Sequence, residues 1–387
     1  MLQGFTKKNL IDAFSIMYSS RRLDEKMLNL LKQGKSFFHM GASGHEASQV
    51  AAAFEMQPSY DWSYPYYRDA AFCLKLGMTV REQLLSYLSK KDNANNGRQM
   101  PHHYNHRELR IVSQSSATGT QFLQAVGCAM SRKLENNDEI VYVSAGEGTT
   151  SQGDFHEALN WASNLRAPVI FHIQDNEYAI STHKSVQNAD SVYSISSGYR
   201  NLSRYNVDGV DFFETNLAFK EAIKRARKGR GPSLIVSNVV RLLPHSSSDD
   251  QRKYRTEKEL LEDQERDPLV VFKREAIKNK IIKGSEFKKI ELEIKKSIEK
   301  DVEWSLSQED PNPDNAHRYV YSSKSIEVET AKNPISREKV VMVDAINHAL
   351  NEEMDLNPKM IIYGQDIADP KGGVFTATKG LSSKYGK

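Results

Sequence analysis

The chain has 387 residues, enough for two domains with a sizeable core. Its 53 basic and 50 acidic residues leave a net charge of +3, too mild to indicate a nucleic-acid or membrane partner. Only Cys73 and Cys128 occur, without paired spacing, so neither a disulfide scaffold nor a zinc site is expected. The N-terminus lacks the apolar core of a secretory signal, and no run of about 18 apolar residues occurs. We therefore expect a cytoplasmic protein.

Four helices are predicted before residue 140, at 7–35, 43–57, 79–90 and 120–134. Thr79 is the expected N-cap of the third, with Glu82 three residues on as in a capping box. Residues 91–110 are polar and irregular. Strands and helices then alternate as far as Val240, which favours an α/β fold with a parallel sheet flanked by helices.

The most informative segment runs from Ser144 to Thr182. The apolar, β-prone residues before it, 140–143, predict a buried strand. Gly146 and Gly148 follow on either side of Glu147, and they let the backbone turn sharply and approach a ligand closely.

A helix is predicted over 153–166 and a second strand over 168–174, with Asp175 and Asn176 just past its end. This unit places an acid and an amide at the carboxyl ends of two strands, where open α/β sheets bind ligands. Glu147 and Asn176 offer hard oxygen ligands, which suit Mg²⁺ bridging a phosphate.

The pattern Gly-Glu-Gly, 26 residues, Asp-Asn resembles the thiamine diphosphate fingerprint, normally Gly-Asp-Gly followed at this distance by Asn-Asn. The surrounding strings resemble the E1 α subunit of 2-oxoacid dehydrogenase complexes. Glu147 in place of Asp is also found in the branched-chain members, and Asp175 replaces the first Asn. A lone Gly-x-Gly would indicate only a turn, but the spacing and the flanks make that reading remote. The resemblance implies Mg²⁺ held by Glu147, Asn176 and the backbone carbonyl of Tyr178, and cofactor contacts at Gly146, Gly148 and Thr149.

The string Tyr66-Tyr67-Arg68-Asp69 resembles the family's Tyr-Arg pair at the cofactor diphosphate. The resemblance implies that Tyr67 and Arg68 bind there, and arginine offers a planar fork of donors suited to phosphate oxygens. Gln174 stands where branched-chain members carry another phosphate-binding Arg. It can donate a hydrogen bond to the diphosphate, but without charge.

Residues 115–121, SSATGTQ, resemble a loop of branched-chain E1 that lies beside the cofactor rings. The resemblance implies that Ser116 and Thr118 face the cofactor, although Thr118 replaces an apolar Leu. It also implies a possible K⁺ site made by Ser115, Thr120, Gln121 and the carbonyl of Ala117. A serine-rich turn that caps the following helix is a compatible reading.

Two further strings resemble branched-chain E1 more than the pyruvate enzymes. In GRQMPHHY, residues 97–104, His103 aligns with the family histidine near the active-site channel, whereas His102 and His106 are expected to be solvated. In RLLPHSSSDD, residues 241–250, the resemblance implies that His245 acts at the diphosphate and orders the loop around the lipoyl channel.

The same string implies that Arg241 assists His245. Ser246 matches a serine that is phosphorylated in mitochondrial relatives. A phosphate there would repel a diphosphate by charge, but whether this control operates is not readable from the sequence.

The charged segment after the 241–250 loop predicts helices, with a packing stripe of Phe287, Ile290, Ile294, Ile298 and Val302. We assign residues 1–314 to the E1 α-like domain that binds diphosphate and Mg²⁺, and 315–337 to a linker. Residues 338–387 resemble the start of an E1 β subunit, with a helix from about 337 to 354 and a strand at 360–363. One helix and one strand cannot bury a parallel-sheet core, so we expect a fragment of a longer α–β fusion, or a chain that docks on missing partner sequence. The family's β-derived catalytic Glu would lie beyond it.

The predicted activity is oxidative decarboxylation of a 2-oxoacid, branched-chain by the loop strings, with acyl transfer to a lipoyl-bearing E2 acyltransferase. The expected assembly is a homodimer of fused α–β chains or an α2β2-like tetramer, without nucleic acid or membrane. Two alternatives stay open: a pyruvate or acetoin E1, and an inactive half that binds thiamine diphosphate and Mg²⁺ and needs a β partner. A transketolase-like enzyme and a Mg²⁺ phosphohydrolase fit the strings less well.

Overall fold

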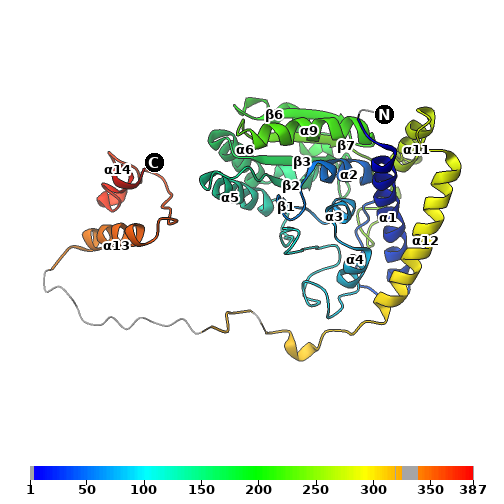
Figure 1. Ribbon diagram of the computed structural model, residues 1–387, viewed down its shortest axis with the longest axis horizontal. Coiled ribbons are helices and arrows are strands. Elements are labelled where there is room, and N and C mark those ends of the chain that lie inside the picture. The colour runs from blue at the N-terminus through cyan, green and yellow to red at the C-terminus, as the bar shows by residue number, and fades with distance from the viewer. Residues whose placement is uncertain (1–3, 319, 325–338, 387) are drawn as a thin grey trace. The chain divides into compact units, whose positions relative to one another are not determined.

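The computed structural model describes residues 4–318, 320–324 and 339–386. The chain divides into two compact units, Met1–His317 and Arg318–Lys387 (Figure 1). None of the helices in the described ranges has both the length and the apolar character needed to cross a membrane.

Helices pack around the sheet in the first unit. They are α1 (Lys7–Lys32), α2 (Glu46–Glu55), α3 (Ala70–Leu76), α4 (Val80–Tyr87), α5 (Thr120–Leu134), α6 (Gly153–Leu165), α7 (Lys184–Gln187), α8 (Val192–Ile195), α9 (Phe212–Arg227), α10 (Glu257–Glu265), α11 (Pro268–Lys278) and α12 (Gly284–Leu306). The predicted capping box is confirmed, because Thr79 accepts from the backbone of Glu82 and the Glu82 carboxylate accepts from the backbone of Thr79.

Within the described residues of this unit, five strands form one all-parallel sheet in the order β1-β2-β3-β7-β6. They are β1 (Trp62–Tyr64), β2 (Val141–Gly146), β3 (Val169–Asp175), β6 (Ser203–Asp208) and β7 (Ser233–Asn238). Gly146 pairs with Gln174, and Asp175 pairs with Asn238, so the carboxyl ends of three strands meet at one edge. The predicted parallel α/β fold is confirmed.

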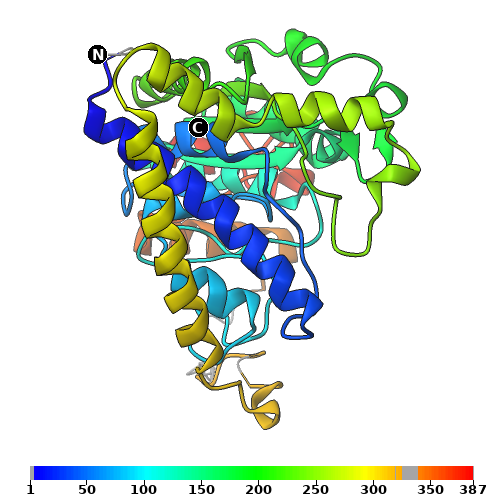
Figure 2. The same cartoon turned by 90° about the vertical axis from the view of Figure 1, so that its right-hand side faces the viewer.

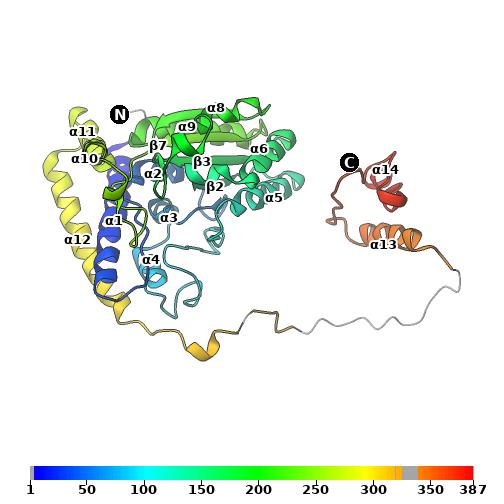
Figure 3. The same cartoon turned by 180° about the vertical axis from the view of Figure 1, so that it is seen from behind.

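Alternating side chains of the sheet face two helical layers. Tyr142, Ile170 and Ile235 pack with α2, α3 and α9 on one face. Val143 and Phe171 pack with α5, α6 and α8 on the other (Figure 3). Each such apolar side chain contributes roughly 1.5–3 kcal/mol when fully buried, so both faces hold the site's supporting strands firmly.

A further helical layer lies outside α2, where α12 runs beside α1 (Figures 1 and 2). The predicted stripe on α12 is confirmed: Phe287, Ile298 and Val302 are buried, and Ile290 and Ile294 pack partly against the same clusters.

The second unit contains α13 (Met342–Leu356) and α14 (Leu381–Tyr385) in its described part. The strand predicted at 360–363 is wrong: these residues form no ladder, and Tyr363 is 84% exposed. A strand needs a neighbour to satisfy its backbone groups, and the described residues offer none here. Residues 325–337 of the predicted linker, and the predicted start of the helix near 337, lie outside the described residues.

Candidate active site

A cleft of about 360 Å³ lies at the carboxyl edge of the sheet. The predicted site residues in its wall are Tyr67, Arg68, His103, Ser116, Thr118, Gly146, Glu147, Gly148, Thr149, Asn176, Tyr178 and His245. Met40, Met100 and Ile180 add apolar surface. Six predicted residues are not part of the wall: Ser115, Ala117, Thr120, Gln121, Gln174 and Arg241.

Glu147 follows β2 directly and starts the short helix η1 (Glu147–Ser151). It is 1% exposed, and its Oε1 has no hydrogen-bond partner among the described residues. Burial, and then the negative charge of Asp175, raise the pKa of this carboxyl to about 7. A buried carboxylate oxygen without a partner is suited to a hard cation, which would replace the missing hydrogen bond.

Asn176 lies at the adjacent strand end, just past β3. Its Oδ1 accepts from the backbone N–H of Tyr178 at 3.3 Å, in the short strand β4 (Tyr178–Ala179) that pairs with β5 (Thr182–His183). No cluster of three or more His, Cys, Asp or Glu suited to a metal occurs in the described residues. A cation in this cleft would therefore need amide or carbonyl oxygens beside Glu147, and the residues present supply both kinds.

Gly148 is required by a close approach. A Cβ there would meet the Cβ of Ala179 at 2.6 Å, well inside contact distance. Strand β4 can therefore lie directly against η1, which brings the backbone of Tyr178 beside Glu147.

Arg68 joins the first strand end to the loop after β7. Its guanidinium donates to the carbonyl of Gly41, and to the carbonyl and Nδ1 of His245 at 2.9 and 3.1 Å. Arginine only donates, so Nδ1 is an acceptor and the neutral ring carries its proton on Nε2. Burial, then the charges of Arg68 and Arg241, lower the pKa of His245 to about 3.

His103 and Ser116 meet across the cleft wall, although they come from two separately predicted loops. Nδ1 of His103 donates to the carbonyl of Pro101 at 3.0 Å, and Nε2 accepts from the Ser116 hydroxyl at 2.8 Å. The ring is thus held in one tautomer at the cleft.

Gln174, expected from the sequence at the diphosphate, is fully buried beneath the cleft and is not part of its wall. Its Nε2 donates to Asp69 at 2.6 Å, and its Oε1 accepts from His45 Nδ1 at 2.8 Å and Gln49 Nε2 at 3.0 Å. Both ends of the amide are engaged. His45 could not be predicted from the sequence, because its partners come from distant segments of the chain.

Arg241 is also buried behind the wall. It donates to the carbonyl of Ile180 at 3.0 Å and to the Tyr254 hydroxyl at 2.7 Å, and its guanidinium lies 5.7 Å from the Tyr178 ring centroid. It supports the cleft wall from outside and, through its charge, helps to keep His245 neutral.

The 115–121 loop turns tightly into α5. Thr120 donates to the carbonyl of Ala117 at 3.0 Å. Gln121 accepts from the backbone of Gly119 at 3.1 Å and donates to the carbonyl of Ser144 at 3.1 Å. The predicted cation ligands thus lie together in one turn, and Ser115 is exposed.

The expectation that His102 and His106 are solvated is wrong. His102 is 2% exposed, with Nε2 3.1 Å from Nδ1 of His39, whose Nε2 lies 2.9 Å from Asp24. His106 is partly buried and contacts Glu82 at 3.2 Å. A polar loop gives no sign of such burial, because the partners are far away in sequence.

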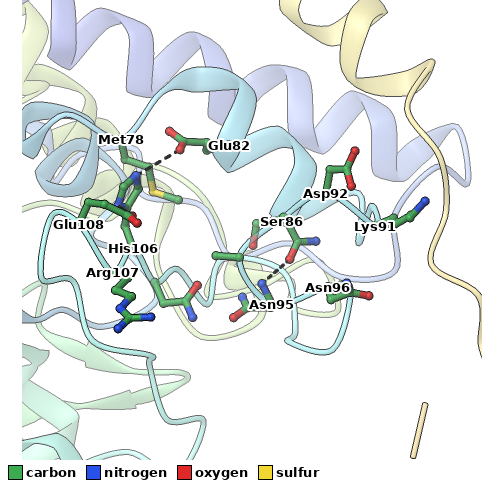
Figure 4. A pocket seen from close by; sticks show the side chains of 13 residues that line it. Met78, Glu82, Ser86, Lys91, Asp92, Asn95, Asn96, His106, Arg107 and Glu108 are labelled. Carbon is green, nitrogen blue, oxygen red and sulfur yellow. Dashed lines mark hydrogen bonds and ion pairs between the residues drawn. The ribbon is translucent and has the colours of Figure 1, made fainter. Parts of the chain in front are cut away.

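A second cavity, about 590 Å³, lies between α4 and the polar segment that follows it (Figure 4). The contact between His106 and Glu82 crosses its wall, and none of the predicted site residues lines it. Asn95 in the wall of this cavity donates to the carbonyl of His103 at 3.2 Å, and His103 lines the cleft. A single hydrogen bond therefore connects the two walls.

Together, the sheet and the cleft define an α/β protein with a cleft at the carboxyl edge of a parallel sheet, where open α/β sheets bind ligands, and with an unpaired buried carboxylate in the cleft wall. The model of the dehydrogenase E1 component family matches residues 15–314, and the chain belongs to that family. Membership implies thiamine diphosphate as cofactor and confirms the resemblance to the E1 α subunit of the 2-oxoacid dehydrogenases.

Two relatives agree with this assignment. The chain is 40% identical over 271 residues to the 2-oxoisovalerate dehydrogenase subunit alpha of Bacillus subtilis, covering 70% of this chain and 82% of that one. It is 33% identical over 275 residues to the pyruvate dehydrogenase E1 component subunit alpha of Staphylococcus aureus, covering 71% and 72%. The chain is therefore an E1-type oxidoreductase acting on a 2-oxoacid.

Proposed function

We propose that the preferred substrate is a branched-chain 2-oxoacid, which is oxidatively decarboxylated before its acyl group passes to the lipoyl group of an E2 acyltransferase. The observation that carries this choice is the identity of 40% to the 2-oxoisovalerate relative, against 33% to the pyruvate relative over a similar length. The strings at 97–104, 115–121 and 241–250 support it.

The test is dye-coupled oxidation by the full-length protein from its source, with thiamine diphosphate, Mg²⁺ and 2-oxoisovalerate, pyruvate or 2-oxoglutarate in parallel. A higher kcat/KM with 2-oxoisovalerate is expected. Preference for pyruvate would establish the alternative and show that the loop strings do not mark the substrate.

When bound, thiamine diphosphate supplies the electron sink that allows CO₂ to leave. The chain's own residues bind and orient the cofactor and the substrate, and they hold or transfer protons. Tyr67 and Arg68 line the cleft, and a guanidinium suits phosphate oxygens, so we assign the diphosphate to these two residues. His245 presents a neutral Nε2–H donor, whereas His103 presents an Nε2 acceptor to the same cleft.

Mg²⁺ is proposed to be held by Glu147, Asn176 and the Tyr178 carbonyl. The unpaired, buried Oε1 of Glu147 supports this, because it lacks any other partner among the described residues. Replacing Asn176 with Ala should weaken Mg²⁺-dependent binding of thiamine diphosphate by at least about tenfold, since losing even a residue that only supports a ligand costs that much. Isothermal titration would measure it, and an unchanged dissociation constant would reject the ligand assignment.

K⁺ is proposed to bind the turn of Ser115, Ala117, Thr120 and Gln121. The support is that three of these residues already offer oxygens within one tight turn. Replacing K⁺ with tetramethylammonium should lower thiamine diphosphate affinity and the turn's protection from hydrogen exchange. If neither changes, the turn only leads into α5 and binds no K⁺.

The partners proposed are E2 and a β-type unit, with residues 338–387 as the start of that unit in a fused chain and 315–337 as the linker. The support is the exposed apolar surface of α13 and its neighbours, where Met342 is 80% and Leu356 78% exposed. Reductive acylation of a lipoyl domain by the full-length protein tests it. If the protein binds substrate but acylates the lipoyl domain only after a β subunit is added, the inactive-half alternative is favoured.

A further inference from the structure

A chain of four polar side chains runs beneath the cleft to the proposed metal ligand Asn176. Its members are Asp69, Gln174, His45 and Asn176, and the first three are 0% exposed. Gln174 Nε2 lies 2.6 Å from Asp69, His45 Nδ1 lies 2.8 Å from Gln174 Oε1, and His45 Nε2 lies 3.3 Å from Asn176 Nδ2. Gln174 and Asn176 belong to the end of β3, whereas His45 and Asp69 come from two other segments, so only the fold assembles the four.

Asp69, at the end of this row of side chains remote from Asn176, sets the donor and acceptor of each hydrogen bond between them. Asp69 also accepts from the hydroxyls of Ser144 and Tyr142, so it serves as an acceptor for Gln174 as well. The Gln174 amide must then turn its NH₂ group toward Asp69 and its oxygen toward His45.

The oxygen of Gln174 is fixed in that orientation by further donors. Besides His45, it accepts from Gln49 at 3.0 Å and from the Tyr66 hydroxyl at 3.3 Å. A flipped amide would turn its NH₂ group toward the NH₂ group of Gln49 and leave buried donors unsatisfied. Gln49 cannot adapt, because its Nε2 also donates to the carbonyl of Arg68 and its Oε1 accepts from the backbone N–H of Ala71. His45 therefore carries its proton on Nδ1.

With the proton on Nδ1, Nε2 of His45 can only accept. It then requires the NH₂ end of Asn176 and turns the other end of that amide, Oδ1, away from itself. Oδ1 is the atom that a hard cation binds.

We propose that His45 is a positioning residue that, together with the backbone N–H of Tyr178, holds the amide orientation of Asn176 and so presents Oδ1 to the metal. The proposal rests on the proposed role of Asn176 as a Mg²⁺ ligand. It also gives Gln174 a function different from the phosphate contact expected from the sequence. Because its NH₂ group donates to Asp69, its oxygen faces His45 and accepts the Nδ1 proton.

The test measures metal affinity directly, without turnover, by the Mn²⁺ electron paramagnetic resonance signal of full-length protein titrated in the presence of thiamine diphosphate. His45→Leu should weaken Mn²⁺ binding by about 10–100-fold, the usual loss for a residue that supports a metal ligand. His45→Gln should stay much closer to wild type, because an amide can still donate to Gln174 and accept from Asn176.

A matched control is His172→Leu. His172 is also 0% exposed and bonded on both sides, to Tyr142 and Ser237 at 2.9 Å, but it does not touch Asn176. It should lose thermal stability as His45→Leu does, yet keep its Mn²⁺ affinity.

A second experiment uses Asn176→Asp. A carboxylate has two equivalent oxygens, so either orientation presents an oxygen to the metal. In that background the effect of His45→Leu on Mn²⁺ affinity should shrink to a few-fold. An equal loss in both backgrounds would overturn the orientation argument.

The outcomes separate the two levels of inference. Wild-type protein that binds no Mn²⁺ with thiamine diphosphate rejects the metal site and this proposal together. If wild-type protein and His45→Leu bind Mn²⁺ equally well, only the role of His45 is rejected. Equal losses of Mn²⁺ affinity in His45→Leu and His172→Leu would also reject only that role. If His45→Leu does not fold, a loss in His45→Gln as large as about tenfold would also overturn the proposal.

Discussion

Ser116 donates a hydrogen bond of 2.8 Å to Nε2 of His103, and this bond joins two loops that both line the cleft. Because Nδ1 is already committed to the carbonyl of Pro101, Nε2 is the ring atom left to face a ligand. Any substrate or cofactor group that uses His103 as an acceptor must therefore compete with Ser116 or take its place.

Removing the hydroxyl tests this arrangement. Ser116→Ala should lower kcat by roughly tenfold through loss of ring orientation, well short of the 10²–10⁴-fold expected when an acid–base group itself is removed. Thiamine diphosphate affinity should change little. Ser116→Thr retains the hydroxyl and serves as the control, and an unchanged kcat in Ser116→Ala would leave the bond without a catalytic role.

The close approach of η1 and β4 gives a second prediction. In Gly148→Ala the new Cβ overlaps Ala179, so β4 should shift and carry the Tyr178 carbonyl away from Glu147. Mg²⁺-dependent thiamine diphosphate binding should fall at least about tenfold, as for other changes in support of a metal ligand.

The control is Gly127→Ala on α5, where a Cβ would meet nothing within 4 Å. Alanine at a helical position should leave binding intact and add about 0.5–1 kcal/mol of stability. If both variants bind equally well in titration calorimetry, β4 can move without consequence for the site.

His245 gives a third prediction, because Arg68 fixes Nδ1 as an acceptor and leaves the Nε2 proton free for the cleft. In His245→Ala, reductive acylation of a lipoyl domain should fall by about 10²-fold or more, the usual loss for a proton donor. Thiamine diphosphate binding should fall much less, because Arg68 remains. Equal losses in the two measurements would place His245 in cofactor binding alone.

Asp24 gives a prediction about acid stability. Burial opposes its ionisation, but its contacts with His39 and Ser43 hold the pKa of this carboxyl well below its usual value. Because the pKa is lower in the folded state, the stabilisation is complete above the unfolded value near pH 4 and is lost as the pH falls further.

Asp24→Asn should therefore cost about 3 kcal/mol at pH 7, as for a broken buried pair. The difference from wild type should narrow toward pH 3 in urea unfolding curves. Asp12→Asn on the same helix breaks only the exposed contact with Lys75 and should cost about 1 kcal/mol at most. If the difference in unfolding free energy between wild type and Asp24→Asn stays constant with pH, Asp24 stabilises the protein by packing and not by its charge.

Periodicity and spacing predicted the parallel sheet and the strand ends that carry Glu147 and Asn176, because these follow from local pattern and from the topology of α/β sheets. The family resemblance added the loops with His103 and His245. What could not be predicted is the interior. Gln174 was expected to face a phosphate and His102 to be solvated, yet both are buried by partners far away in sequence.

The order of the strands bears on how the chain reaches this state. β7 lies between β3 and β6, although it is the last of these strands to be synthesised. Until residues 233–238 leave the ribosome, β6 has no neighbour in the sheet, and β3 keeps an open edge. His245 follows only a few residues later. The nascent chain thus completes its sheet and the wall of its cleft almost at the same time. A ribosome that stalls before β7 would therefore hold an aggregation-prone sheet edge and an incomplete cleft.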